Sequence, residues 1–197
     1  MLAQTASVST SLSGLCMGKA STVNTNKYIN LSSQFVPSAL TTITVCGKAV
    51  MTKEAALALS AMCKAMIADG LHPKVTSSYR SYATQNTLYN RYVANDGKAE
   101  ADTYSARPGH SEHQTGLAVD IITSTSSLST FKNTKEYAWL MENAEDYGFI
   151  LRYTESKQAI TGYISEAWHR RYVGIETAKD FNTKDMTFDE YYRIYLE

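Results

Sequence analysis

The sequence predicts an α+β domain in which helices pack around a small, mainly antiparallel sheet. Segments with helical spacing of apolar residues precede, interrupt and follow short β-rich segments. The two kinds of segment do not alternate in the regular order of a parallel βαβ fold. At 197 residues the chain is long enough for one sizeable core, and this length does not require two domains.

The individual elements are predicted from periodicity, caps and breakers. Serine and threonine side chains can accept hydrogen bonds from the first turn of a helix, and glycine commonly ends one. Helices are expected from Thr52 over 55–68 to Gly70, from Ser81 to near Gly97, from Tyr137 to Gly148, and from the capping box Thr187–Glu190 onward. Strands are expected over 74–79, 117–122, 149–153 and 160–164.

The first 25 residues differ in composition from the rest of the chain. They are rich in Ser, Thr and small residues and show neither helical nor strand periodicity, so residues 1–25 are predicted to be a tail or linker and 26–197 the folded domain. The tail lacks the basic head and continuous apolar middle of a secretory signal. If the protein acts outside the membrane, we expect that an export signal or anchor has been removed and that Met1 is an added start.

Charge and hydropathy give no support for nucleic acid or a membrane as a partner. The formal net charge is zero, which gives no electrostatic reason to expect nucleic acid or a polybasic membrane contact. The most apolar stretch, 55–68, is interrupted by Lys64. It is also shorter than the ~20 residues needed to cross a bilayer.

Two short segments carry the residue types of a catalytic zinc site. His113 and Asp120 lie in the first segment and His169 in the second. Catalytic zinc usually takes three protein ligands of these types and leaves a fourth position for water. Glu166, three residues before His169, is free to act as the carboxylate that accepts a proton from that water.

The spacing within the first segment requires a turn. His113 and Asp120 are seven residues apart, so in one unbroken strand their side chains would point to opposite faces. Gly116 lies between them and can adopt the backbone angles of such a turn. Asp120 then falls inside the apolar run 117–122, where a charge is costly unless it is paired or bound to metal. The alternative is a surface histidine and a salt-bridged aspartate that are neighbours only in sequence.

The residues around this set resemble a known family. The matching segments occur in order and at the spacing of the VanY-like D-alanyl-D-alanine carboxypeptidases, zinc peptidases related to the D-Ala-D-Ala dipeptidases. They are Ser77–Ser81, Gln85, Ala106–Asp120, Tyr147–Tyr153, Ile160–Gly162 and Glu166–His169. The resemblance runs from about Lys27 to the C-terminus.

The resemblance implies a role for each residue that matches a family motif. His113, Asp120 and His169 are the implied zinc ligands, and Glu166 is the implied general base. Arg80 is expected to steady the substrate and the developing oxyanion. Ser111 and Gln85 are weaker candidates for hydrogen bonds to the peptide. Ala167 stands where family members often have proline, a change that removes no reactive group.

The resemblance also implies the substrate and the place of action. The implied reaction is zinc-dependent removal of the C-terminal D-Ala from a peptidoglycan stem peptide, at the bacterial cell envelope or outside the cell; a cytoplasmic location stays open. One alternative is an L,D-carboxypeptidase that trims tetrapeptide stems, because such relatives share the same motifs. The other is a non-catalytic wall-binding module, which would have little reason to keep both Glu166 and Arg80.

Three cysteines cannot all pair within one chain. Cys63 falls on the apolar face of the helix expected over 55–68, so it is predicted to be a buried, unpaired hydrophobic residue. Cys16 and Cys46 then remain as a possible disulfide, which the sequence alone leaves open.

Overall fold

The computed structural model describes residues 23–197. Cys16 and most of the predicted tail lie outside the described residues. The strands are β1 (Leu40–Ile43), β2 (Ala49–Thr52), β3 (Pro73–Ser77), β4 (Ala118–Thr123), β5 (Phe149–Leu151) and β6 (His169–Tyr172). The α-helices are α1 (Lys53–Ala68), α2 (Tyr82–Asp96), α3 (Lys98–Tyr104), α4 (Lys135–Asn143), α5 (Gln158–Thr161), α6 (Ile175–Asn182) and α7 (Phe188–Tyr191).

Short 3-10 and π turns complete the secondary structure. The 3-10 turns are η2 (Glu112–Thr115), η3 (Phe131–Asn133), η4 (Ala144–Tyr147) and η5 (Glu155–Lys157), and the π turn is η6 (Tyr192–Leu196). The turn η2 and strand β4 together carry the first segment with predicted metal donors, His113 and Asp120. The second begins just before β6.

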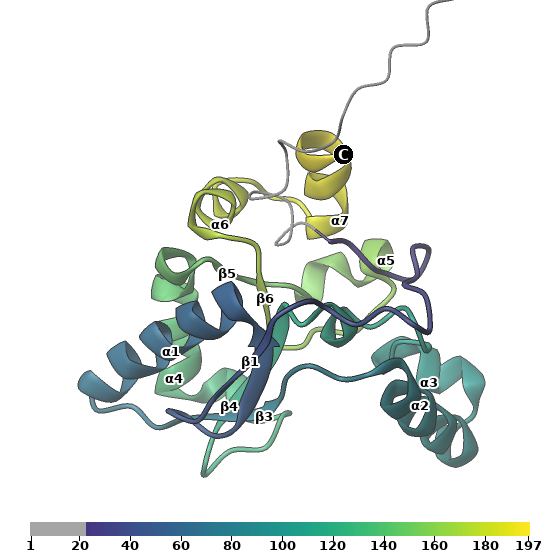
Figure 1. The fold of residues 1–197 in the computed structure, drawn as a ribbon, viewed down its shortest axis with the longest axis horizontal. Coiled ribbons are helices and arrows are strands. Elements are labelled where there is room, and N and C mark those ends of the chain that lie inside the picture. The colour runs from purple at the N-terminus through teal and green to yellow at the C-terminus, as the bar shows by residue number, and fades with distance from the viewer. Residues whose placement is uncertain (1–22) are drawn as a thin grey trace, which may run out of the picture.

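The predicted α+β architecture with an antiparallel sheet is confirmed. The central sheet has the strand order β3-β4-β6-β5, and each of its neighbouring pairs is antiparallel. Strands β1 and β2 form a separate antiparallel pair. Helices α2 and α3 lie together on one side of the molecule, whereas α1 lies on the other side (Figure 1).

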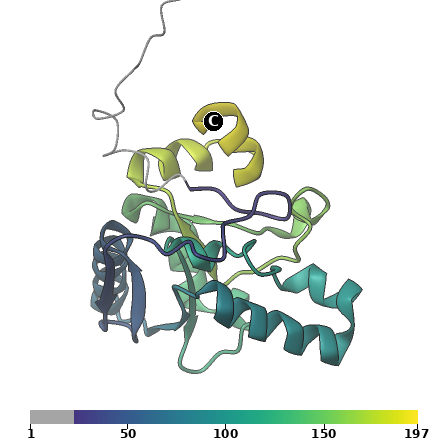
Figure 2. The ribbon, with the colours of Figure 1, turned by 45° about the vertical axis from the view of Figure 1, so that its right-hand side comes forward.

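The main core lies between the central sheet and α1. Most residues of α1 are apolar, and its buried positions (Ala55, Ala56, Leu59, Met62, Cys63 and Met66) follow the helical spacing expected of a core-facing stripe. Strand β4 is buried along its whole length. A smaller cluster lies under α6 and α7 and includes Phe181, Phe188 and Tyr191. Figure 2 shows these two helices stacked at one end of the domain, beside the strap formed by the first described residues.

The prediction for the cysteines was wrong. Cys63 does not stand alone in the α1 face but forms a disulfide with Cys46, 17 residues earlier. Both residues are buried in the main core, where the loop before β2 passes over α1. Periodicity correctly placed Cys63 in the core, but it could not indicate which other residue meets that helix face.

The strand predicted over 160–164 was also wrong. This segment contains the single helical turn of α5, which ends at Gly162. Thr161 turns its hydroxyl onto the carbonyls of Lys157 and Tyr163, a local bonding pattern that competes with strand pairing. The missing strand is β6, which pairs with both β4 and β5.

Within residues 23–197, no helix is long and apolar enough to cross a membrane.

The last three residues of the predicted tail pack against the domain. The Val23 carbonyl accepts a hydrogen bond from Arg171, and the Thr25 hydroxyl donates to the Gly109 carbonyl. The exact boundary of the folded domain stays a prediction.

Candidate metal centre

The register of the central sheet brings Asp120 and His169 together. Asp120 on β4 is the direct cross-strand partner of His169 on β6. Directly opposite residues of an antiparallel pair project from the same face of the sheet with their Cβ atoms about 5 Å apart. Residues 49 positions apart in the chain thus become neighbours through backbone pairing alone.

His113 reaches the same point from the turn η2. Gly116 ends that turn with φ +69°, and a Cβ there would also lie only 3.1–3.3 Å from side chains of Leu40, Pro37 and Thr52. Glycine therefore satisfies both the backbone conformation and the close packing. The predicted turn between His113 and Asp120 is confirmed.

The donor atoms of these three residues lie close enough together to hold one zinc ion. His113 Nε2 lies 3.3 Å from Asp120 Oδ2, and His169 Nδ1 lies 3.1 Å from Asp120 Oδ1. One donor atom from each residue can be chosen so that all lie within 4.8 Å of one another. Tetrahedral zinc with bonds of about 2.0–2.1 Å needs donors roughly 3.3 Å apart. Two imidazoles and one carboxylate are also ligand types that zinc prefers, so the residues present fit the metal.

The surroundings prepare these side chains to bind a cation. His113 Nδ1 is 2.8 Å from the Ser78 carbonyl, so Nδ1 carries the proton and Nε2 keeps a lone pair facing Asp120. Burial lowers the pKa of His113, which favours the neutral form. Burial alone would raise the pKa of Asp120, but the two histidines hold it far below its usual range.

His169 lies between two carboxylates. Its Nδ1 faces Asp120, and its Nε2 is 3.1 Å from Glu112 Oε2. Burial alone would lower the pKa of His169, but the hydrogen bonds to Asp120 and Glu112 raise it to about 9. A proton on this ring would therefore compete with a metal ion at neutral pH.

Glu166 lies beside the three donor residues without belonging to them. Its Oε2 is 3.6 Å from His169 Nδ1. Burial raises the pKa of Glu166 to about 7, and the charge on His169 opposes this rise. A carboxylate with such a pKa can both accept and return a proton near neutral pH.

Arg80 borders the same cavity and is held in place by its neighbours. Its guanidinium donates to Gln85 Oε1 at 2.8 Å and to Ser77 Oγ at 2.7 Å, and it approaches Asp120 to 4.0 Å. The Gln85 amide in turn donates to the Ala106 carbonyl. Both ends of the Gln85 amide are thus engaged within the protein, which favours a role in holding Arg80 over direct contact with a peptide.

The seven predicted site residues border one cavity of about 350 Å³. They are Arg80, Gln85, Ser111, His113, Asp120, Glu166 and His169. Ser111 is buried, and its hydroxyl forms no hydrogen bond with any of residues 23–197, so it can bond to a bound molecule. Tyr153, Tyr163 and Leu128 supply aromatic and apolar surface.

Sequence reasoning missed Glu112 and the two arginines around it. Glu112 Oε1 accepts hydrogen bonds from Arg152 Nε at 2.8 Å and from an Arg171 terminal nitrogen at 2.9 Å. All three side chains are fully buried. Arg152 gave a signal in the sequence, a charge directly after the apolar run 149–151, since buried charges need partners, but the sequence does not indicate which charges pair.

Fold and site together are typical of a zinc-dependent peptidase: an α+β domain with two histidines, one aspartate and a neighbouring glutamate in a cavity beside the sheet. The profile of the VanY family, D-alanyl-D-alanine carboxypeptidase, matches residues 48–175. The chain belongs to this family.

Individual relatives agree with this assignment. The chain is 40% identical over 148 residues to the putative carboxypeptidase YodJ of Bacillus subtilis (strain 168), covering 74% of this chain and 54% of YodJ. The structure of VanYB in complex with D-alanine-D-alanine superposes with a TM-score of 0.78 at 34% identity, covering 89% of this chain and 98% of VanYB. The LdcB LD-carboxypeptidase superposes with a TM-score of 0.77 at 37% identity, covering 86% and 84%. The chain spans about half the length of the curated relative.

Proposed function

We propose that the protein is a zinc-dependent D,D-carboxypeptidase that removes the C-terminal D-Ala from peptidoglycan stem peptides. The observation that carries this proposal is the placement of Glu166 and Arg80 in the same cavity as the His113, Asp120 and His169 donors, with Glu166 beside His169 and Arg80 beside Asp120. A site for metal storage or structural metal would need the donors but neither of the other two groups. The family profile and the D-alanine-D-alanine bound to VanYB support the choice of substrate.

Each side chain has a distinct task in the proposed reaction. Zinc, when bound, supplies a Lewis acid that polarises the scissile carbonyl and lowers the pKa of a bound water from 15.7 to roughly 7. Glu166 accepts a proton from the attacking water and passes it to the leaving amine. Arg80 donates hydrogen bonds to the substrate and to the carbonyl oxygen as negative charge develops there, where one such donor commonly contributes ~3 kcal/mol.

The remaining cavity residues position the peptide and the arginine. Gln85 and Ser77 hold the guanidinium of Arg80 in one orientation, so its planar donors are aligned before substrate arrives. The Ser111 hydroxyl is available to bond to the peptide or its terminal carboxylate.

The proposed place of action is the cell envelope or the outside of the cell. The Cys46–Cys63 disulfide supports this location, because disulfides persist in oxidising compartments and are rare in the cytosol of most bacteria. Peptidoglycan stem peptides are also accessible there. Thiol labelling of the protein in its native host tests the location, and a fully reduced pair would contradict it.

A second candidate function is L,D-carboxypeptidase activity on tetrapeptide stems. The 37% identity to the LdcB LD-carboxypeptidase, over most of both chains, favours keeping this candidate. The two activities require the same chemistry and differ in which residue precedes the scissile bond.

The experiment that tests the proposal measures D-Ala release from pentapeptide and tetrapeptide stems, each with and without a chelator. Release from the pentapeptide that stops with chelation and returns with zinc is the expected result. Release only from the tetrapeptide would favour the L,D candidate. No release from either, with peptide binding retained, would indicate a non-catalytic wall-binding module.

A further inference from the structure

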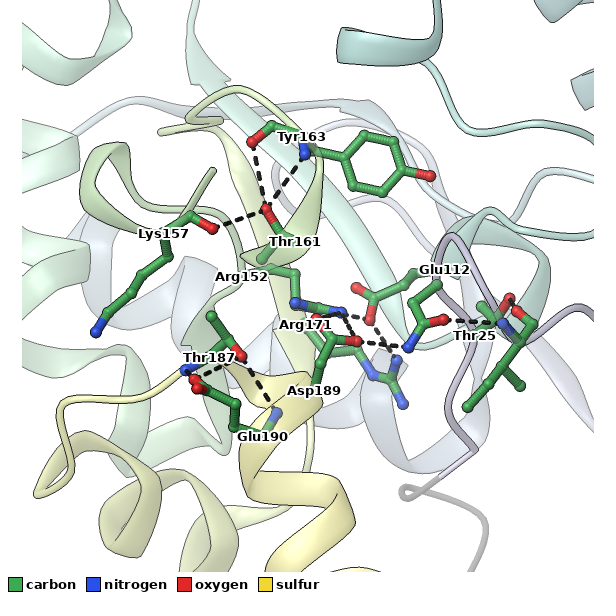
Figure 3. Close-up of polar contacts among 12 residues, drawn as sticks. Thr25, Glu112, Arg152, Lys157, Thr161, Tyr163, Arg171, Thr187, Asp189 and Glu190 are labelled. Carbon is green, nitrogen blue, oxygen red and sulfur yellow. Dashed lines mark hydrogen bonds and ion pairs between the residues drawn. The ribbon is translucent and has the colours of Figure 1, made fainter. Parts of the chain in front are cut away.

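A buried cluster of charges lies behind the metal centre, on the side of His169 away from the cavity donors. Glu112 occupies its middle and divides its two oxygens between different partners. Oε1 accepts from both Arg152 and Arg171, whereas the one partner of Oε2 among residues 23–197 is His169 Nε2. Figure 3 shows the two guanidinium groups converging on the Glu112 carboxylate.

The hydrogen bond between Glu112 and His169 decides which ring nitrogen of His169 can bind a metal. A neutral imidazole has one N–H and one lone pair, so the nitrogen that donates to a carboxylate cannot ligate. With Nε2–H donating to Glu112, the lone pair must lie on Nδ1, the nitrogen that faces Asp120 and Glu166. His113 shows the opposite assignment, because its Nδ1 donates to a carbonyl and leaves Nε2 as the donor.

We propose that Glu112 is a positioning residue for zinc, which fixes His169 in the ring orientation and tautomer that present Nδ1 to the metal. The arginines prevent the carboxylate from turning away, since each is bonded to the oxygen that His169 does not use. Carboxylates that hold a ligating histidine in this way commonly affect metal affinity by about 10–100-fold. The inference rests on the proposed zinc site but not on the identity of the substrate.

The cluster extends to both ends of the described chain. Arg152 also donates to Asp189 on α7 at 3.0 Å, and Asn26 in the N-terminal strap donates to the same Asp189 oxygen at 2.7 Å. Helix α7 is itself fixed by the capping box of Thr187 and Glu190 (Figure 3). The C-terminal helix is thereby connected to the metal ligand through Asp189, Arg152 and Glu112.

The first test compares two buried glutamates by chelator competition for zinc. Glu112→Gln keeps the side-chain volume but removes the charge that His169 and the arginines contact, so we expect zinc affinity to fall by about 10–100-fold. Glu136→Gln is the matched control. Glu136 is also buried, and it accepts a hydrogen bond from the His72 backbone far from the metal centre, so zinc affinity should be unchanged even if stability falls.

A milder variant tests the extension to α7. Asp189→Asn removes a charge whose side chain is 19% exposed and leaves Glu112 and both arginines in place. We expect a fall in zinc affinity smaller than that of Glu112→Gln. Unchanged affinity in Glu112→Gln would overturn the proposal.

The second test needs no variant, so it holds even if Glu112→Gln does not fold. In the wild-type protein labelled with nitrogen-15 and loaded with cadmium-113, metal coupling is expected to Nδ1 of His169 and to Nε2 of His113. A proton is expected on Nε2 of His169. Coupling to Nε2 of His169 would overturn the proposal, whereas a wild-type protein that binds neither metal would instead overturn the proposed function.

Discussion

Two glutamates approach His169 from opposite sides of its ring, and their surroundings give them opposite properties. Both carboxylates are buried, and burial alone raises the pKa of each. Arg152 and Arg171 hold the pKa of Glu112 well below its usual range. Within the described part of the chain Glu166 has no such pair of arginines, and burial raises its pKa to about 7.

This difference shows how one residue type can serve two tasks within one site. A carboxylate that never takes up a proton is suited to hold a ligand in a constant orientation. A carboxylate that is half protonated near neutral pH is suited to move a proton. The comparison predicts that changes at Glu112 act on metal binding and that changes at Glu166 act on turnover.

The largest effect on turnover is expected from Glu166→Ala. The variant removes the proton carrier but no metal donor, so turnover should fall by about 10²–10⁴-fold while zinc content stays at the wild-type level. Steady-state D-Ala release and metal analysis of the same preparation measure both quantities. Near-normal turnover with zinc bound would remove the distinction between the two glutamates.

The second-largest loss of activity is expected from Arg80→Ala. Loss of its donors should lower kcat/KM by about 10²–10³-fold, with contributions from both kcat and KM. Arg80→Lys should recover only part of this loss, since an ammonium cannot reproduce the planar donor pair. Gln85→Ala removes one hydrogen-bond partner of Arg80 but keeps the guanidinium, so it should lower kcat/KM less than Arg80→Ala does. A larger fall in kcat/KM than that of Arg80→Ala would argue for direct contact of Gln85 with the peptide.

Zinc affinity should depend on pH through His169. Because the pKa of His169 is raised to about 9 in the protein without metal, zinc must displace a proton at any lower pH. Affinity should therefore rise by roughly tenfold per pH unit up to about pH 9. Calorimetric titration in buffers of different ionisation enthalpy counts the released proton, and zinc binding at pH 7 without proton release would contradict the assignment.

The rate should also have an acidic limb that comes from Glu166. With its pKa raised to about 7, Glu166 is the active base above that pH and is lost as the pH falls through it. The positive charge of bound zinc shifts this limb toward lower pH. A profile of kcat/KM from pH 5 to 9 measures the limb, which should be absent from the residual activity of Glu166→Ala.

The smallest effect on activity is expected from the double variant Cys46→Ala, Cys63→Ala. Removing a cross-link between residues 17 positions apart should lower the free energy of unfolding by about 3 kcal/mol. Neither residue touches the cavity, so kcat and zinc affinity of the folded protein should not change. Denaturant unfolding and activity at low temperature separate the two quantities, and a loss of zinc would show that the core and the site are coupled.

The candidate metal donors could be proposed from the sequence because each belongs to a local pattern. Asp120 is a charge inside an apolar strand, and His113 lies before a glycine turn. His169 follows Glu166 by three residues in a second local pattern, and the resemblance to the VanY family then implied a role for each of these residues. These predictions needed only residue type and spacing along a short segment.

The features that the sequence did not reveal all depend on long-range pairing. The disulfide joins a loop to a helix face, and β6 takes the strand position that was assigned to 160–164. Glu112 contacts Arg152 and Arg171, which lie 40 and 59 residues away. A lone buried charge predicts that a partner exists, but several arginines were available, and only the fold selects between them.

The cross-strand pairing of Asp120 with His169 has a consequence for how the substrate range of this domain can diverge. A deletion of one residue within β4 or β6 would turn one donor to the other face of the sheet, so these strands tolerate no change in length. The loops within the 45 residues between them, 124–168, carry no such constraint on their length, and this segment supplies Leu128, Tyr153 and Tyr163 to the cavity wall. New specificities can therefore evolve, or be grafted, by changes in these loops while the metal donors, Arg152 and Glu166 are inherited unchanged.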